Sequence, residues 1–156
     1  MSAEKAKAHL MKYGFADRII TLGESSATVE LAAHALGCEP ARIAKSLTFS
    51  ANGKPVMIVT AGDVKIDNAK YKAQFGCKAK MLSPNEVAEL IGHLIGGVCP
   101  FGVNDGVDVY LDVSLKRFER VFPAAGSGNT AVDLSIEELE KCSEFKEWTD
   151  VTKPTA

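Results

Sequence analysis

The fold is decided by the stretch LTFSANGKPVMIVTA, which occupies residues 47–61 of the chain. Leu47 and Phe49 alternate with polar residues, and this period of two is typical of a half-buried strand. Asn52-Gly53 is a strong signal for a two-residue hairpin turn, because both residues tolerate positive φ. Residues 55–61 are mostly apolar and predict the return strand. We therefore expect a β-hairpin in the first half of the chain.

Short segments of both types are predicted on either side of the hairpin. Helix starts are marked by Thr28 and by capping boxes at Ser83 and Ser135, and Gly37 marks a helix end. The expected helices span 3–11, 28–36, 67–75, 83–91 and 135–141, and the expected strands span 19–22, 80–82, 107–113, 121–122, 131–134 and 145–151. The tail after Thr152 is expected to fray. Strands and helices do not alternate regularly, which favours a mixed α/β domain around one curved sheet over a doubly wound fold.

Composition limits the class of protein. The 156 residues fit a single domain, and 46% hydrophobic with 24% charged residues is an ordinary globular composition. The net charge of −2 gives no global basic field for nucleic acid. No membrane-length apolar run and no signal peptide are visible, so we expect a cytoplasmic protein with no membrane partner. The four cysteines form no Cys-x-x-Cys pair, and we expect no metal and no cofactor.

A glycine-rich stretch, GHLIGGVCPFG, occupies residues 92–102. Its glycines allow positive φ and close backbone approach, and Pro100 removes one donor. Its other residues are apolar, unlike those of a surface linker. Two interpretations remain open: a loop whose N–H groups bind a ligand, or a tight turn packed under a sheet.

Two charged residues are candidates for chemistry. Lys45 falls on the face of Leu47 and Phe49, so it either extends its ammonium to the rim or stands at the mouth of a cleft, where it binds a carbonyl or phosphate oxygen. Asp133 lies between two apolar residues, and it either faces outward from an edge strand or receives a substrate ammonium in the same cleft. His93 is more typical of a helix cap or a surface group than of a base.

Several motifs together resemble one family. They are TVELAA at 28–33, LG at 36–37, RIAKSL at 42–47, GGVCPFG at 96–102, and GSGN at 126–129 followed by VDL at 132–134. Their order and spacing resemble the YbaK/ProX family, whose members are free-standing relatives of the editing domain of bacterial prolyl-tRNA synthetase. The resemblance extends over about residues 16–151.

The resemblance implies a YbaK-like fold over residues 1–156: a single domain with a curved, barrel-like mixed sheet flanked by helices. It also implies a trans-editing hydrolase that deacylates mischarged aminoacyl-tRNA, with tRNA-Pro carrying a small wrong amino acid as the expected substrate. The family's key lysine corresponds to Lys45, its glycine loop to residues 96–102, and its late aspartate to Asp133. The chain departs from other members at residues 20–23, which lack the aromatic or histidine seen in some of them, and at Ser46 and Cys99; these departures leave the identity of the amino acid open.

These correspondences define the expected site. Catalysis is expected from Lys45, Gly96 and Gly97, with glycine N–H groups holding the carbonyl oxygen and the lysine binding phosphate or ribose oxygens. Substrate contacts are expected from Thr21, Ser46, Cys99, Pro100, Phe101, Gly102 and Asp133. The general base is unassigned: the resemblance allows the substrate itself or a bound water to serve, and Cys99 as a nucleophile is a further option.

The expected partner is the acceptor end of aminoacyl-tRNA, with prolyl-tRNA synthetase as a further candidate and a monomer or homodimer as the assembly. Two other functions fit the same cleft: a non-catalytic regulator that binds a tRNA end or a nucleotide, and an esterase for an unrelated activated ester. A local patch of lysines could guide the acceptor stem, although a solvated helix face is the commoner role of such residues. The lysines concerned are Lys65, Lys70, Lys72, Lys78 and Lys80.

Overall fold

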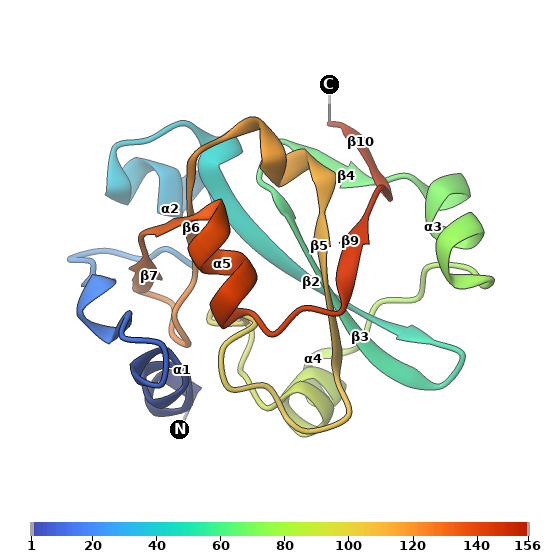
Figure 1. The fold of residues 1–156 in the computed structure, drawn as a ribbon, viewed down its shortest axis with the longest axis horizontal. Helices are drawn as coiled ribbons and strands as arrows, with labels where there is room; N and C mark the ends of the chain where they lie inside the picture. Colours follow the sequence, from blue (N-terminus) through green and yellow to red (C-terminus); the bar gives the residue numbers. More distant parts are fainter. Residues whose placement is uncertain (1, 156) are drawn as a thin grey trace.

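The hairpin predicted from the sequence lies at the centre of the structure, a computed structural model that describes residues 2–155 (Figure 1). Strands β2 (Ile43–Ala51) and β3 (Lys54–Ala61) pair in antiparallel register along their length. Asn52 and Gly53 form the turn with φ of 54° and 81°. Two consecutive positive φ values define the tight turn that suits the twist of a hairpin, so the prediction is confirmed.

A six-stranded mixed sheet extends from this hairpin in the order β8-β6-β2-β3-β5-β9. The other four strands of this sheet are β5 (Asp108–Asp112), β6 (Arg120–Pro123), β8 (Leu134–Ser135) and β9 (Glu147–Thr149). Three of the pairings are parallel: β2 with β6, β3 with β5, and β5 with β9. The sheet curls into a half-barrel flanked by helices, which confirms the expected mixed α/β class.

Two small sheets complete the strand pairing. They consist of β1 (Ile19–Thr21) with β7 (Thr130–Val132), and of β4 (Val64–Ile66) with β10 (Thr152–Pro154). The expectation of a frayed tail is therefore wrong, because β10 is paired with β4. The single strand expected at 131–134 is also wrong, because the chain changes sheets at Asp133.

The strand expected at residues 80–82 is reduced to one bridge, in which Met81 faces Phe49. Backbone hydrogen bonds connect Lys80 and Leu82 to β2 on either side of it. The pairing stops there because Ser83 caps the next helix.

The helices begin and end near the predicted positions. They are α1 (Ser2–Met11), α2 (Val29–Leu36), α3 (Asn68–Phe75), α4 (Pro84–Glu86) and α5 (Ile136–Cys142). Shorter 3-10 turns are η1 (Ala16–Arg18), η2 (Pro40–Arg42) and η4 (Val113–Arg117), and α4 continues into the π-helical turn η3 (Val87–Ile91). Thr28 caps α2 by accepting from the Leu31 N–H, and Gly37 ends that helix with φ of 68°. Both predicted capping boxes are present.

Helices cover both faces of the sheet. The main core packs α1, α5 and η3 against β3 and β5, with Met57 and Leu111 fully buried between them. On the opposite face α3 packs Tyr71 against Phe49. A third cluster joins α2 to Ile43 at the start of β2. In Figure 1, α2 and β7 lie at one end of the molecule and α3 lies at the other.

The alternation in β2 follows the expected register, but both faces of the strand are covered. Lys45 and Phe49 point to the side of α3, as the sequence predicted for one face. Ala44 and Ser46 point to the side of the main core. Lysine and serine therefore leave the same strand end in opposite directions.

Candidate active site

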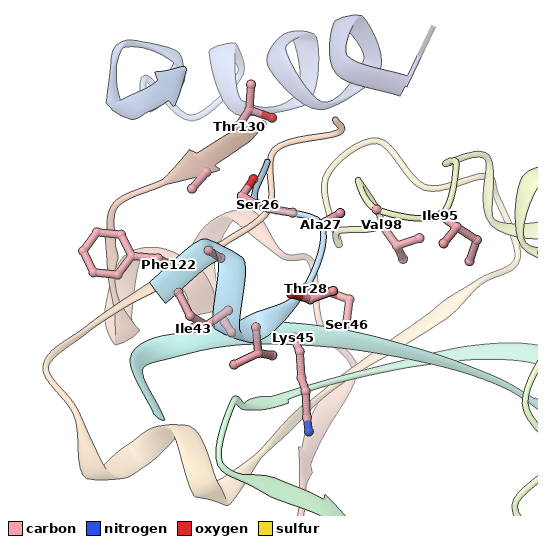
Figure 2. Close-up of a pocket in the computed structure, with 16 residues that line it drawn as sticks. Ser26, Ala27, Thr28, Ile43, Lys45, Ser46, Ile95, Val98, Phe122 and Thr130 are labelled. Atoms are coloured by element: carbon pink, nitrogen blue, oxygen red, sulfur yellow. The ribbon is translucent and has the colours of Figure 1, made fainter. Parts of the chain in front are cut away.

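A pocket of about 210 Å³ lies between α2 and the beginning of β2 (Figure 2). Most of its lining is apolar, and the polar side chains belong to serines, threonines and one lysine. The lining residues are Ser26, Ala27, Thr28, Val29, Ala32, Ile43, Ala44, Lys45, Ser46, Ile95, Gly96, Val98, Phe122, Ala124, Thr130 and Ala131. Lys45 is the ionisable side chain among these residues.

Three loops of small residues meet at this pocket. The loop before α2 is joined to the loop after β6 by the Ser26 N–H, which donates to the Gly128 carbonyl at 2.6 Å. The Leu22 N–H donates to the Asn129 carbonyl at 2.7 Å. These bonds attach two segments that lie about a hundred residues apart in the chain. The wall of the pocket is therefore fixed by backbone contacts.

The glycine loop contributes the third segment. A Cβ on Gly97 would lie 2.5 Å from the backbone of Gly126 and Ser127, so the two loops pack backbone against backbone. Gly96 has φ of +96° and would place a Cβ 3.5 Å from that of Ala27. Glycine is required at Gly97 by close approach and at Gly96 by its conformation. The loop thus combines a tight packed turn with a wall of the pocket.

The two glycine N–H groups differ in availability. The Gly97 N–H donates to the Leu94 carbonyl at 3.0 Å and closes a turn. The Gly96 N–H has no acceptor within residues 2–155. Of the two candidates for an oxyanion donor, the structure therefore leaves Gly96 free at the pocket wall.

His93 anchors the beginning of the glycine loop. Its Nε2 donates to the Phe101 carbonyl at 2.7 Å, and its Nδ1 lies 2.5 Å from the Ser2 hydroxyl. This arrangement suits a neutral ring that donates through one nitrogen and accepts through the other. The side chain is buried, which lowers the pKa of His93, while the bond to Phe101 opposes that shift and Lys5 and His9 add to it. The imidazole is therefore a structural link and not a surface group.

We expect stability to fall at acid pH through His93. Because its folded-state pKa lies below the unfolded value of about 6.5, the unfolded chain takes up the proton first as the pH falls. The loss begins near that value and has an upper limit of about 1.4 kcal/mol per pH unit. Thermal unfolding of wild type and His93→Gln between pH 7.5 and 5.5 measures it. The wild type should lose more stability across this range than the variant, and equal slopes would contradict the assignment.

Lys45 lines the pocket, but its ammonium leaves the strand on the side of β4 (Figure 2). There Nζ donates to the Val64 carbonyl. Burial lowers the pKa of Lys45, and the carboxylates of Asp63 and Glu30 oppose this shift. The result is a partly desolvated cation whose ammonium binds the Val64 carbonyl, outside the pocket lining.

Two serines of the pocket have buried hydroxyls without a hydrogen-bond partner among residues 2–155. They are Ser26, before α2, and Ser46, on β2. A buried hydroxyl without a partner costs free energy, since native proteins satisfy most such groups. Both residues line the pocket, but their hydroxyl oxygens are themselves covered by neighbouring atoms.

The second half of the glycine loop belongs to the core. Cys99, Pro100 and Phe101 are buried, and Gly102 packs against the backbone of Lys5. The Cys99 sulfur lies 3.7 Å from His93 Nε2, and burial raises the pKa of the thiol to about 12. The structure thus places all four residues behind the pocket wall and gives Cys99 the protonated form.

Thr21 and Asp133 also lie outside the pocket lining. Thr21 pairs with Thr130 at the end of β1 and is exposed. The Asp133 carboxylate accepts from Arg120 Nε at 2.8 Å, and it does not meet Lys45 in one cleft. Of the residues expected at the site, the structure brings Lys45, Ser46 and Gly96 together, with Gly97 packed directly behind.

Sequence reasoning missed much of the pocket wall. Ser26, Ile43, Phe122 and Thr130 all line it. Ile43 lies in the RIAKSL motif, whereas the other three lie outside the quoted motifs and reach the pocket through the curl of the sheet or a loop contact. The cap at Thr28 was the available signal, since it fixed where α2 begins.

The lysines considered as a guide for the acceptor stem lie elsewhere. Lys72 and Lys78 border a recess beside α3, and Lys70 pairs with Asp150 at 3.0 Å. Because α3 lies at the opposite end of the molecule from α2, these residues do not border the pocket (Figure 1).

Within residues 2–155 there is neither a metal-binding cluster nor a membrane-spanning helix. No group of three or more His, Cys, Asp or Glu side chains is placed to hold a metal ion. None of the helices in this part of the chain has the length and apolar character needed to cross a membrane.

Comparison with known proteins places the chain in a family. Residues 23–142 match the profile described as the aminoacyl-tRNA editing domain. The chain is 52% identical over 154 residues to the uncharacterized protein YwhH of Bacillus subtilis, with 98% of each covered. It is 31% identical over 104 residues to the proline--tRNA ligase of Bacillus licheniformis, and 30% over 125 residues to that of Thermosipho melanesiensis. These alignments cover 66% and 80% of the chain but only 18% and 22% of the ligases.

Solved structures agree with this placement. A protein provisionally assigned as a trans-editing enzyme for prolyl-tRNA synthetase has a TM-score of 0.87 and 29% identity, with 97% of each chain covered. A hypothetical protein has a TM-score of 0.85 and 26% identity, with 96% of this chain and 99% of the other covered. The resemblance drawn from the motifs is confirmed: the chain belongs to the aminoacyl-tRNA editing domain family.

Proposed function

We propose that this protein hydrolyses, in trans, the ester of mischarged tRNA-Pro that carries a small amino acid. The observation that carries the proposal is the pocket, which Lys45 and Gly96 of the family motifs both line among mostly apolar side chains. A cavity of about 150 Å³ is large enough for benzene. A pocket of about 210 Å³ therefore has room for a small aminoacyl group.

The chemistry needs little from the protein, because an aminoacyl ester is already activated. Water adds to the ester carbon, the carbonyl oxygen becomes an oxyanion, and the ribose oxygen leaves with a proton. The main requirement is a donor aimed at the developing oxyanion. We assign this role to the Gly96 N–H, which has no other acceptor within the described residues. The packing of Gly97 against Gly126 holds that donor in place.

Lys45 is assigned to the RNA side of the ester. Its ammonium is a compact charge with three donors, suited to phosphate and ribose oxygens. The Val64 carbonyl that now accepts from it is a neutral partner, which an anionic oxygen can replace.

The lining offers neither a carboxylate nor an imidazole as a general base. We therefore expect catalysis to depend on positioning and on oxyanion stabilisation, with the proton passing through water or the substrate itself. The same observation favours one alternative, a regulator that binds the tRNA end without turnover.

The deciding experiment is hydrolysis of a panel of tRNA-Pro charged with alanine, cysteine, serine or threonine, with prolyl-tRNA-Pro as the control. We expect rapid release of at least one of the four wrong amino acids and slow release of proline. If the folded protein binds the tRNAs and releases none of the four, the regulator replaces the deacylase. Release of amino acids from simple esters alone, with no preference for tRNA, would instead indicate a small-molecule esterase.

A further inference from the structure

We propose that Leu94 and Ile95 form an apolar platform on which the terminal nucleobase of the aminoacylated RNA packs. The inference rests on the proposed function, since it concerns the same site. Leu94 is 61% exposed and Ile95 is 64% exposed, although both are branched aliphatic residues. Because the two side chains are adjacent, they place exposed apolar surface at one point of the loop, and covering such surface with a partner is favourable. We call this pair the 94–95 platform.

The platform borders the pocket directly. Ile95 is part of the lining, and Figure 2 shows it beside Val98 at the edge of the lining side chains. The next residue, Gly96, carries the N–H assigned to the oxyanion. The platform and the reacting carbonyl therefore belong to neighbouring peptide units of one loop.

The covalent structure of the ester determines which part of the substrate lies at the rim of the pocket. The acyl group in the pocket is joined through one oxygen to a ribose, which carries the base on the same ring. When the carbonyl reaches Gly96, the nucleoside has to leave the pocket across its rim. An exposed apolar surface at that rim is suited to the flat face of a base, whereas phosphates prefer charged or N–H donors.

The loop that carries the platform is held on both sides. The Gly97 N–H donates to the Leu94 carbonyl, and Gly97 packs against the backbone of Gly126. On the other side His93 is buried and bonded to the Phe101 carbonyl. Leu94 and Ile95 are thus exposed on a turn that hydrogen bonds and packing hold in one conformation. A loop that is already ordered loses little conformational entropy when a ligand binds.

The 94–95 platform should bind a nucleobase without discriminating among the four bases. Aliphatic side chains make no hydrogen bonds to base edges, so any base with a π-face can pack on them. We therefore expect an aminoacylated guanosine end to be accepted nearly as well as an adenosine end. A second copy of the chain or a protein partner on this surface would give a different result, because it would require no base.

The test compares wild type, Leu94→Ser and Leu94→Ser/Ile95→Ser. Met11→Ser is the matched control, because Met11 is 62% exposed on α1 and lies outside the pocket lining. Each protein is assayed on the preferred aminoacyl-tRNA, on the corresponding aminoacyl-adenosine and on the ethyl ester of the same amino acid. We expect the double variant to lose about 5- to 20-fold in kcat/KM on both adenosine-bearing substrates, mainly through KM. Its preference for them over the ethyl ester should fall by the same factor.

Equal losses on the ethyl ester and the nucleoside substrates would overturn the platform, as would an unchanged kcat/KM on aminoacyl-tRNA. A change in oligomeric state in the double variant, with its substrate preference intact, would assign the surface to a protein contact instead. The wild-type rates test the deacylase proposal separately. If they are zero, binding of non-hydrolysable 3′-aminoacylamido-adenosine decides: weaker binding by the double variant supports the platform, and equal or absent binding contradicts it.

Discussion

Replacing Lys45 with alanine is expected to lower kcat/KM for the mischarged tRNA by about 100-fold or more. Truncating one partner of a desolvated, hydrogen-bonded charge pair costs about 2–5 kcal/mol, and the middle of that range corresponds to a loss of more than about 100-fold. Lys45 is the sole ionisable residue in the described pocket lining, so no neighbour there can take over its charge. Because burial lowers its pKa, the native fold gains little from this cation, and the variant should remain folded.

Two further variants separate the charge from other effects. Lys45→Met retains an apolar stem without the ammonium and should lose as much activity as the alanine variant. Lys141→Ala removes an exposed lysine of α5 and should leave the rate unchanged. Deacylation by Lys45→Met at the wild-type rate would show that the stem, and not the charge, matters. Steady-state rates with thermal melts distinguish these outcomes.

Replacing Gly97 with alanine is expected to damage both stability and activity. The added Cβ would lie 2.5 Å from the Gly126 carbonyl carbon and the Ser127 nitrogen, and these are backbone atoms that cannot rotate away. Overpacking of this kind costs about 3 kcal/mol, which corresponds to a fall of about 6–12 °C in Tm for a domain of this size. The displaced loop also carries Gly96, so the rate should fall by more than the loss of folded protein explains.

Gly23→Ala is the matched control for this substitution. A Cβ on Gly23 meets nothing within 4 Å, and the residue does not have positive φ. We expect its Tm and its rate to stay close to those of the wild type. A Gly97→Ala protein with wild-type Tm and wild-type rate would show that the loops can separate without harm, and it would remove the structural basis for placing the oxyanion donor at Gly96.

The elements predicted correctly share a local origin. The Asn52-Gly53 turn and the caps at Thr28 and Ser135 depend on the φ preferences and hydrogen bonds of a few successive residues. The wrong predictions concern strands whose existence depends on a distant partner. Residues 152–154 form a segment of three residues with no hydrophobic alternation, yet they pair with β4. No local pattern contains that information.

The candidate site shows the same division. Lys45, Ser46 and Gly96 reach the pocket, and each belongs to a recognisable motif. Cys99 lies in the same glycine loop as Gly96 but faces the core, because the chain turns inward between them. Composition cannot reveal which half of a glycine-rich loop is buried.

The sequence by itself determined the hairpin, the helix boundaries, the mixed α/β class and the family to which the motifs belong. Local backbone preferences and the order of motifs depend on residues that are consecutive in the chain, so they can be predicted without a structure. Only the tertiary structure decided that loops at 26–28, 96–98 and 124–131 enclose one pocket, that Lys45 turns to Val64, and that Leu94 and Ile95 stand exposed at the rim. These features arise from the packing of segments far apart in the chain, whose contact energies depend on the whole fold.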